Sequence, residues 1–169
     1  MENSIPDGIR IGRADYANPR HAAALVSLLD AYARDPMGGG EALSDFAKAN
    51  VVSELAKLPQ AFSLLAFDGE GDETPVGLAN CMLGFSTFAC KPLVNVHDLT
   101  VAAACRGRRI GERLLAEVER VARAHGACKV TLEVLSGNPA LRLYVRSGFA
   151  QYQLDPAAGQ AGFMQKWLD

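Results

Sequence analysis

The sequence lacks the clustered ligands that metal sites and disulfide frameworks require. It has four cysteines that form no CxxC pair, and its three histidines do not cluster. A structural zinc site shows such pairs at short spacing, and a disulfide scaffold needs more cysteine in a shorter chain. We therefore predict no metal centre, and we expect reduced and mostly buried thiols, as in a cytosolic protein. The cysteines are Cys81, Cys90, Cys105 and Cys128.

The sequence also has little net charge and no long apolar run. Lys and Arg together number 17 and Asp and Glu 19, for a formal net charge of -2. Any anion site must therefore be local, and we predict no binding of nucleic acid. No apolar stretch reaches the roughly 20 residues that span a bilayer, and the start, MENSIPDGIRIGRAD, lacks a basic-then-apolar signal pattern. We expect a cytoplasmic protein with no membrane partner.

What the chain does have is the size and composition of one globular domain. Its 169 residues are 49% hydrophobic and 21% charged, which suffices for a single sizeable core. No repeat, linker or low-complexity tract interrupts it. We predict one domain over residues 1–169.

Hydrophobic periodicity predicts alternating strands and helices. Asn18 and Ser44 are expected to cap the first two helices, and the glycine-rich loop between these helices is expected to be flexible. The element order indicates an α/β (α+β) fold with one mixed sheet and helices on both faces. The third helix crosses between two strands and should make them parallel neighbours. We expect strands over 9–14, 61–68, 76–88, 93–101, 128–135, 149–154 and 162–168, a hairpin turn over 68–75, and helices over 19–35, 45–58, 109–125 and 139–146.

The stretch CRGRRIGERLL, residues 105–115, holds four arginines and two glycines, and three of the arginines stand where a strand gives way to a helix. The first amides of a helix lack intrahelical acceptors, and the helix dipole adds positive potential there. Gly107 and Gly111 allow close approach of a bulky diphosphate, and Arg106, Arg108 and Arg109 can add charge-assisted contacts. The alternative is a surface turn with solvated arginines. The stretch has neither the Walker nor the GxGxxG pattern.

Residues 93–149 resemble the acetyl-CoA core of the GNAT superfamily of N-acetyltransferases. The resemblance rests on DLTV-x(4)-RGRRIGERLL and on the later NPALRLYVRSGF. It implies the acyl-CoA N-acyltransferase (GNAT) fold, in which about four helices flank a central mixed, mostly antiparallel sheet. It further implies acetyl transfer from acetyl-CoA to a primary amine of a small molecule or protein, by direct attack and without a metal. Homodimers through the C-terminal strands are frequent in the family.

The family loop (Q/R)-x-x-G-x-(G/A) binds the CoA pyrophosphate, and this chain departs from it at one position. Arg106 fits the first position and Gly111 the last, whereas Arg109 stands where the family has its first glycine. We interpret Arg109 as a variation that is tolerated if its backbone stays helical. The resemblance implies a cofactor-binding set of Leu99, Thr100, Val101, Arg106, Gly107, Arg108, Arg109, Ile110, Gly111, Glu112, Asn138 and Tyr144.

The resemblance also assigns roles around the thioester. Backbone groups of Leu99 and Val101 are expected to bond the pantetheine arm and to polarise the thioester carbonyl, near a bulge in the strand. Tyr144 matches the family tyrosine that protonates the departing thiolate, although packing in the core is the alternative. Asn138 resembles the asparagine that contacts the arm, but it precedes Tyr144 by six residues where many members have seven.

A base or water relay is useful because an amine acceptor arrives mostly as ammonium. Imidazole is suited to this task near neutrality, and His97 lies two positions before Leu99, where many family members carry an acidic residue. By simple alternation His97 shares a face with Leu99 and Val101, while Asp98 points to the other side. We therefore predict His97 as base or water relay, and Asp98 as its structural partner or as a cap that faces a helix. The alternative is a satisfied interior histidine.

The acceptor pocket is assigned mostly by elimination. In the family, the loop between the first two helices forms one wall, and the strand before the cofactor strand forms the floor. Asp35 and Glu41 of this loop could attract a cation, and Phe85 and Phe88 could line an apolar slot. Three alternatives stay open: an acyl-CoA sensor without turnover, a transferase with another acyl donor or an oxygen acceptor, and a protein-interaction module.

Overall fold

The structure is a computed structural model, and it describes residues 8–69, 74–153, 155, 157, 159 and 161–168. The chain divides into two compact units, residues 1–132 and 133–169, which are described one after the other. The single domain over 1–169 stays a prediction. The expected hairpin turn over 68–75 falls partly outside the described residues.

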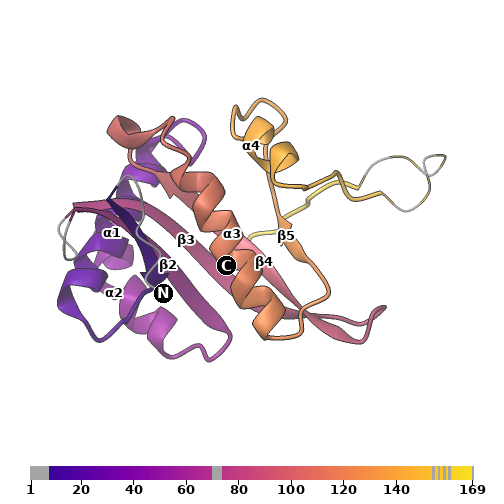
Figure 1. The fold of residues 1–169 in the computed structure, drawn as a ribbon, viewed down its shortest axis with the longest axis horizontal. Helices are drawn as coiled ribbons and strands as arrows, with labels where there is room; N and C mark the ends of the chain where they lie inside the picture. The colour runs from indigo at the N-terminus through magenta and orange to yellow at the C-terminus, as the bar shows by residue number, and fades with distance from the viewer. Residues whose placement is uncertain are drawn as a thin grey trace. The chain divides into compact units, whose positions relative to one another are not determined.

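The first unit is built on a five-stranded sheet whose spatial order follows the chain. The first three neighbouring pairs are antiparallel and the last pair is parallel. This confirms the mixed, mostly antiparallel sheet and the parallel pair joined by a helical crossover (Figure 1). The strands are β1 (Ile9–Arg13), β2 (Ala61–Asp68), β3 (Thr74–Ser86), β4 (Lys91–Val101) and β5 (Val130–Leu132).

Both predicted helix caps are present at the start of the first two helices. Helix α1 (Pro19–Arg34) begins after Asn18, whose side-chain oxygen accepts from a backbone amide at 2.9 Å. Helix α2 (Asp45–Ala56) begins after Ser44, whose hydroxyl accepts at 3.1 Å. Each cap satisfies one of the amides that a helix start leaves without a partner. α2 ends two residues before the predicted Leu58.

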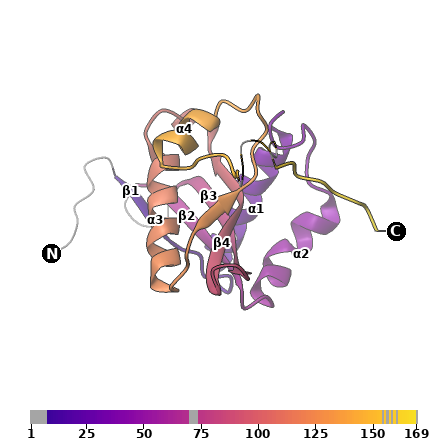
Figure 2. The same ribbon diagram turned by 90° about the vertical axis from the view of Figure 1, so that its right-hand side faces the viewer.

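Helices cover both faces of the sheet, as the element order predicts. Helix α3 (Ile110–Ala124) lies on one face, and α1 and α2 lie on the other (Figure 2). Neighbouring residues of β2 take opposite sides: Leu64 packs into the core on the α3 side, and Leu65 into the core on the α1 side. This two-sided burial explains why β2 is mostly apolar, apart from Ser63, instead of alternating between apolar and polar residues.

The parallel pair is shorter than its sequence pattern predicts. Residues 128–135 alternate like a strand, yet β5 pairs with β4 only through Val94–Val130, Asn95–Thr131 and Val96–Leu132. The pairing ends one residue before an irregularity in β4, which is described below. A parallel ladder needs matched peptide orientations on both strands.

The second unit holds helix α4 (Leu141–Arg146) and the C-terminal segment. The predicted strands over 149–154 and 162–168 are wrong for the described residues, none of which is in a strand. A strand persists only where a partner completes its ladder. The apolar side chains of these segments, among them Phe163 and Trp167, are 77% and 84% exposed.

Candidate functional site

Strand β4 carries one extra residue relative to β3. Asn80 pairs with Asp98, and the next residue of β3, Cys81, pairs with Val96. His97 is therefore a β-bulge, and it lies in the strand to which the family resemblance assigns the cofactor arm. A bulge bends its strand and changes which groups of that strand face each side.

The bulge sets the direction of the peptide groups that follow it. Beyond it, the Ala102 amide donates to the Val76 carbonyl of β3 at 2.9 Å. Hydrogen-bonded and non-hydrogen-bonded pairs alternate in an antiparallel ladder. The peptide groups of Leu99 and Val101 therefore point away from β3, toward the edge where β5 has already ended. Consistent with this, the Val101 carbonyl accepts from Nε of Arg106 at 3.3 Å.

Before the bulge, the even-numbered residues of β4, not the odd-numbered ones, direct their peptide groups away from β3. The Val94 amide donates to the Lys129 carbonyl on the β5 side at 3.1 Å, so even-numbered residues face β5 there. If His97 instead paired with Asn80 in a regular ladder, the even-numbered residues would keep facing the β5 side along the whole strand. Leu99 and Val101 would then bond to β3. The bulge therefore decides that the peptide groups of Leu99 and Val101, and not those of Asp98 and Thr100, face away from β3.

His97 does not share a face with Leu99 and Val101, because the bulge interrupts the alternation on which that prediction rested. Its exposed side chain turns toward Asn95, and its Nδ1 is hydrogen-bonded to the Asn95 side-chain oxygen. An amide oxygen can only accept, so Nδ1 carries the proton. In neutral His97 the other ring nitrogen, Nε2, is then the proton acceptor.

Asp98 lies on the α1 face of the sheet, where its carboxylate accepts from the Asn80 side-chain amide at 2.9 Å. Its negative charge reaches two neighbours. Burial raises the pKa of the Cys81 thiol to about 12, and the Asp98 carboxylate adds to this shift. Burial also raises the pKa of Tyr32 on α1, again with a contribution from Asp98. The charge of Asp98 therefore lies between β3 and α1.

The arginine-rich loop connects β4 to α3 through a short 3-10 turn, η1 (Ala103–Cys105). Gly107 has a φ of 85°, in the left-handed region that favours glycine. The Arg113 amide donates to the Arg109 carbonyl at 3.1 Å. The amides of residues 110–112, the first three of α3, precede this bond and have no acceptor within the helix. The loop therefore presents amides at a helix start, as its sequence predicts.

The backbone conformation of Arg109 differs from the one that we expected from the sequence. Its φ of 60° and ψ of 16° are left-handed, so its backbone does not stay right-handed helical as we had required. A residue with a Cβ in this region costs roughly 1–2 kcal/mol. The position therefore has the conformation for which the family glycine is suited. The Arg109 side chain is 80% exposed and lies 3.4 Å from the Glu112 carboxylate.

The other two arginines are paired with aspartates from distant parts of the chain. Arg106 donates to Asp35, just after α1, at 2.9 Å. Arg108 forms an ion pair with Asp68 at the end of β2. The Met37 amide and then Arg106 hold the pKa of Asp35 below its usual value, and Arg108 does the same for Asp68. The loop thus has positive charges that carboxylates partly neutralise.

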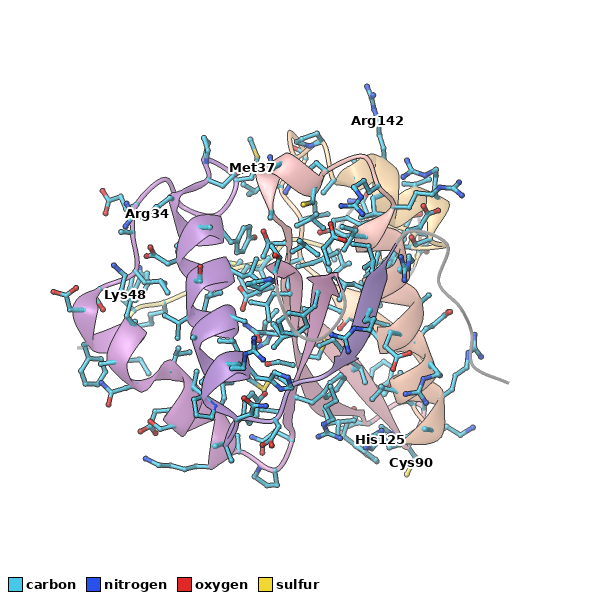
Figure 3. The ribbon with its side chains drawn as sticks, turned by 60° about the vertical axis from the view of Figure 1, so that its left-hand side comes forward. Arg34, Met37, Lys48, Cys90, His125 and Arg142 are labelled. Atoms are coloured by element: carbon cyan, nitrogen blue, oxygen red, sulfur yellow. The ribbon has the colours of Figure 1, made fainter. Side chains whose placement is uncertain are left out.

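The structure brings only one predicted acceptor residue to the loop. Asp35 contacts Arg106, whereas Glu41 is exposed on the loop between α1 and α2. Phe85 and Phe88, 57% and 94% exposed, lie at the β3–β4 turn, and Phe85 pairs with residue 92 at the opposite end of β4 from the arginines. Figure 3 shows this separation, with Met37 at one end of the sheet and Cys90 at the other.

The loop between α1 and α2, which its glycines predict to be flexible, makes several hydrogen bonds. The Gly38 and Gly40 amides donate to the Asp35 carbonyl at 2.7 and 3.1 Å, and the Leu43 amide donates to the Asp30 carboxylate at 2.9 Å. A Cβ at Gly38 would lie 2.0 Å from the Tyr32 carbonyl oxygen. Glycine is therefore required there for close backbone packing.

Tyr144 and Asn138 belong to the second unit. Tyr144 is buried in α4, with its ring edge toward Phe149 at a centroid distance of 6.0 Å. The side-chain oxygen of Asn138 accepts from the Ala140 amide at 2.9 Å, so it caps the turn that leads into α4. The roles of both residues toward a cofactor stay predictions.

The cysteines are less buried than we expected. Cys81 is buried, but Cys90 and Cys128 are exposed because they lie in turns at strand ends. All four are free thiols. Within the described residues, no three potential ligands gather into a metal site. Over the same residues, no helix combines the length and apolarity needed to cross a bilayer.

One part of the site was missed in the sequence. Ser63 and Asn80 are buried polar residues inside apolar strands, and they connect Asp98 to Tyr16 through hydrogen bonds. The signal was available, because a serine in AFSLLAFD and an asparagine in GLANCML interrupt otherwise apolar runs. Buried polar groups need partners, but the sequence does not say which ones.

A mixed sheet covered on both faces, with a bulged strand leading into a basic helix start, is the architecture of the acyl-CoA N-acyltransferases. A solved structure of this class, AAC(6')-Iy in complex with a bisubstrate analog, CoA-S-monomethyl-acetylneamine, superposes with a TM-score of 0.71 at 17% identity, over 95% of this chain and 99% of that one. The model of the acetyltransferase (GNAT) family matches residues 25–149. The chain belongs to this family.

Two curated relatives are similar to parts of the chain. YwnH of Bacillus subtilis (strain 168), assigned as a phosphinothricin acetyltransferase, is 28% identical over 105 residues, which are 56% of this chain and 64% of YwnH. The streptothricin acetyltransferase of Streptomyces lavendulae is 36% identical over 89 residues, which are 50% of this chain and 47% of that protein. The matches thus span about half to two thirds of these relatives.

Proposed function

We propose that this protein is an acetyl-CoA-dependent N-acetyltransferase that acts on a primary amine. One observation carries the proposal: the register that the bulge at His97 sets directs the peptide groups of Leu99 and Val101 away from β3, to the edge of β4 beyond the end of β5. This edge leads directly into the arginine-rich start of α3. A strand edge that offers backbone amides as hydrogen-bond donors, followed by an anion-binding helix start, suits a long ligand with a carbonyl at one end and a diphosphate at the other.

The residues of the loop fit the diphosphate. The amides at the start of α3 would accept one part of its charge, and the guanidinium groups of Arg106 and Arg108 another. Both arginines are paired with carboxylates in the protein alone, at Asp35 and Asp68. Phosphate oxygens would therefore compete with these aspartates. When bound, acetyl-CoA would supply an activated acetyl group that passes from sulfur to the amine nitrogen, with release of the thiol.

Residues of β4 would remove the proton that the amine must lose. At neutral pH only about one lysine-like amine in 2,500 is uncharged. Neutral His97 holds its proton on Nδ1 and leaves Nε2 able to accept another. The Asp98 carboxylate would attract the ammonium form. Tyr144 would donate a proton to the leaving thiolate, a role that the family resemblance supports.

The acceptor we favour is a small cationic amine. The two curated relatives are named for phosphinothricin and streptothricin, which are small molecules. Asp35, Glu41 and Asp98 supply negative charge on the loop after α1 and on β4. A cation would be drawn to this side of the sheet by ordinary electrostatic attraction.

The test is a screen for thiol release from acetyl-CoA with a panel of small amines and amine-bearing peptides. We expect turnover with at least one small amine and a large loss of kcat in Tyr144→Phe and His97→Ala, with binding of CoA unchanged in His97→Ala. Binding of CoA without thiol release across the panel would instead favour an acyl-CoA sensor. If calorimetry detected no CoA binding, the chain would be better explained as a protein-interaction module.

A further inference from the structure

Four polar side chains form a continuous chain of hydrogen bonds across three strands of the sheet. The hydroxyl of Tyr16 lies 2.9 Å from that of Ser63 on β2. The Ser63 hydroxyl donates to the Asn80 side-chain oxygen on β3 at 2.6 Å, and the Asn80 side-chain nitrogen donates to the Asp98 carboxylate on β4 at 2.9 Å. The chain ends at the residue that follows the bulge.

The direction of every hydrogen bond in this chain is fixed. Ser63 has one proton and gives it to Asn80, so Tyr16 must donate to Ser63. All three donors therefore point toward Asp98, and hydrogen bonds aligned in this way polarise one another. Burial raises the pKa of Tyr16, so its hydroxyl remains a donor throughout the neutral range. An amide cannot easily relay a proton, which makes the chain an orienting device and not a proton wire.

The chain is placed where apolar side chains would serve the fold as well. Ser63 is fully buried and Asn80 is 4% exposed. Their neighbours along the same face, Leu65 and Leu78, belong to the apolar core beneath α1. Replacing a buried polar network by apolar residues of similar size is often neutral or stabilising. The network thus points to a role beyond the stability of the fold.

We infer that Tyr16, Ser63 and Asn80 are positioning residues that orient the Asp98 carboxylate for the acceptor amine. This inference rests on the proposed function. The pair Asn80–Asp98 directly follows the bulge, so the hydrogen-bond chain ends where the regular ladder between β3 and β4 resumes. Asp98 is thereby held on the α1 side, near Tyr32.

A double-mutant cycle, made in the whole polypeptide, tests the inference. Tyr16→Phe and Ser63→Ala each remove one hydroxyl, and we expect each to lower kcat about fivefold with CoA affinity unchanged. Asp98→Asn keeps an acceptor oxygen for Asn80 but removes the charge. In the Asp98→Asn background we expect the two substitutions to have no further effect on kcat. Equal losses in both backgrounds, or no loss in either, would overturn the inference.

Two further variants separate the loss of the hydrogen bond from a loss of folding. Ser63→Thr retains a hydroxyl and should restore most of the kcat that Ser63→Ala loses. Ser53→Ala, on the exposed surface of α2, is the matched control and should leave kcat and thermal stability unchanged. If Ser63→Thr were as slow as Ser63→Ala although both are folded, the hydroxyl would not be the positioning group.

Failure of the proposed function can be recognised separately. If the unmodified protein released no thiol with any amine, the proposed function would fail. The chain of hydrogen bonds from Tyr16 to Asp98 could still be examined by NMR. The side-chain amide protons of Asn80 should then be protected from solvent exchange and should shift in both Tyr16→Phe and Ser63→Ala. Unchanged Asn80 resonances in both variants would show that the loss of a hydroxyl at Tyr16 or Ser63 does not affect the hydrogen bond between Asn80 and Asp98.

Discussion

Arg109 carries a left-handed backbone at the start of α3, where the family loop has a glycine. The side chain makes one ion pair, with Glu112 on the first turn, and is otherwise exposed. An exposed pair of this kind contributes little to stability. The backbone conformation therefore dominates the energetic effect of this residue.

Arg109→Gly should stabilise the protein. Glycine removes the left-handed strain but adds freedom to the unfolded chain, so we expect a net gain of about 0.5–1 kcal/mol. Urea unfolding measures the gain, and calorimetry should show CoA affinity unchanged or higher if the amides bind the phosphates. Arg109→Ala is the control, because it removes the charge and retains the strain. Weaker CoA binding in both variants would show that the guanidinium itself holds phosphate.

In the proposed site, Asp35 would compete with a bound phosphate for Arg106. The two side chains are 2.9 Å apart, and the loop is otherwise rich in donors. Asp35→Asn keeps the shape of the side chain and frees the positive charge, so CoA affinity should rise by about two- to fivefold at low salt. The gain should shrink at high salt because it is electrostatic. A loss of CoA affinity would mean that Asp35 orients Arg106 for the ligand.

At the scale of elements, the contact between β3 and α3 positions the loop. Gly77 pairs with Val101 at the end of β4. A Cβ at Gly77 would meet Leu114 at 2.9 Å and Ile110, the first residue of α3, at 3.1 Å. The absence of a side chain at Gly77 therefore lets the start of α3 approach the sheet.

Gly77→Ala should push the start of α3 outward. We expect a loss of about 1–3 kcal/mol in the free energy of unfolding, together with CoA binding weakened severalfold, because the amides of the helix start move with Ile110. Urea unfolding and calorimetry measure the two effects. Gly12→Ala on β1 is the control, since a Cβ there meets nothing within 4 Å. If Gly77→Ala were destabilised but still bound CoA with full affinity, the contact between β3 and α3 would not be what positions the loop.

Element prediction succeeded where local signals agree with packing. The caps Asn18 and Ser44 and the apolar run of β2 lie where the sequence placed them. Prediction failed for residues 162–168, whose apolar residues form no strand, and for the length of β5. Periodicity states that a segment can pair, but only a partner with matching peptide groups makes it a strand.

At the scale of the whole molecule, ion pairs connect segments that are distant in the sequence. Arg106 reaches Asp35 and Arg108 reaches Asp68, while Asp30 binds Arg34 and the backbone that precedes α2. The partners lower the pKa of all three aspartates below 3.8. Each folded-state pKa therefore lies below the unfolded one. The contribution to stability is present above about pH 4 and is lost as the pH falls through the folded values.

Stability should accordingly stay level between neutral pH and about pH 5 as far as these pairs are concerned, and fall below about pH 4. Urea midpoints across this range measure the profile. A variant with Asn at positions 30, 35 and 68 should be less stable at neutral pH and should lose less between pH 5 and pH 3. If its midpoints fell in parallel with those of the unmodified protein, other carboxylates would be responsible for the acid transition.

The sequence by itself determined the order of helices and strands along the chain, the helix caps and the arginine-rich start of α3, because each depends on residues close together in the chain. The tertiary structure alone decided the rest of the site. Whether the peptide groups of Leu99 and Val101 face β3 or point away from it depends on the register of β4 against β3, which shifts at His97. Likewise, Asn80 and Ser63 become partners of Asp98 only through strand register. Such pairings depend on contacts between distant segments, which no local pattern records.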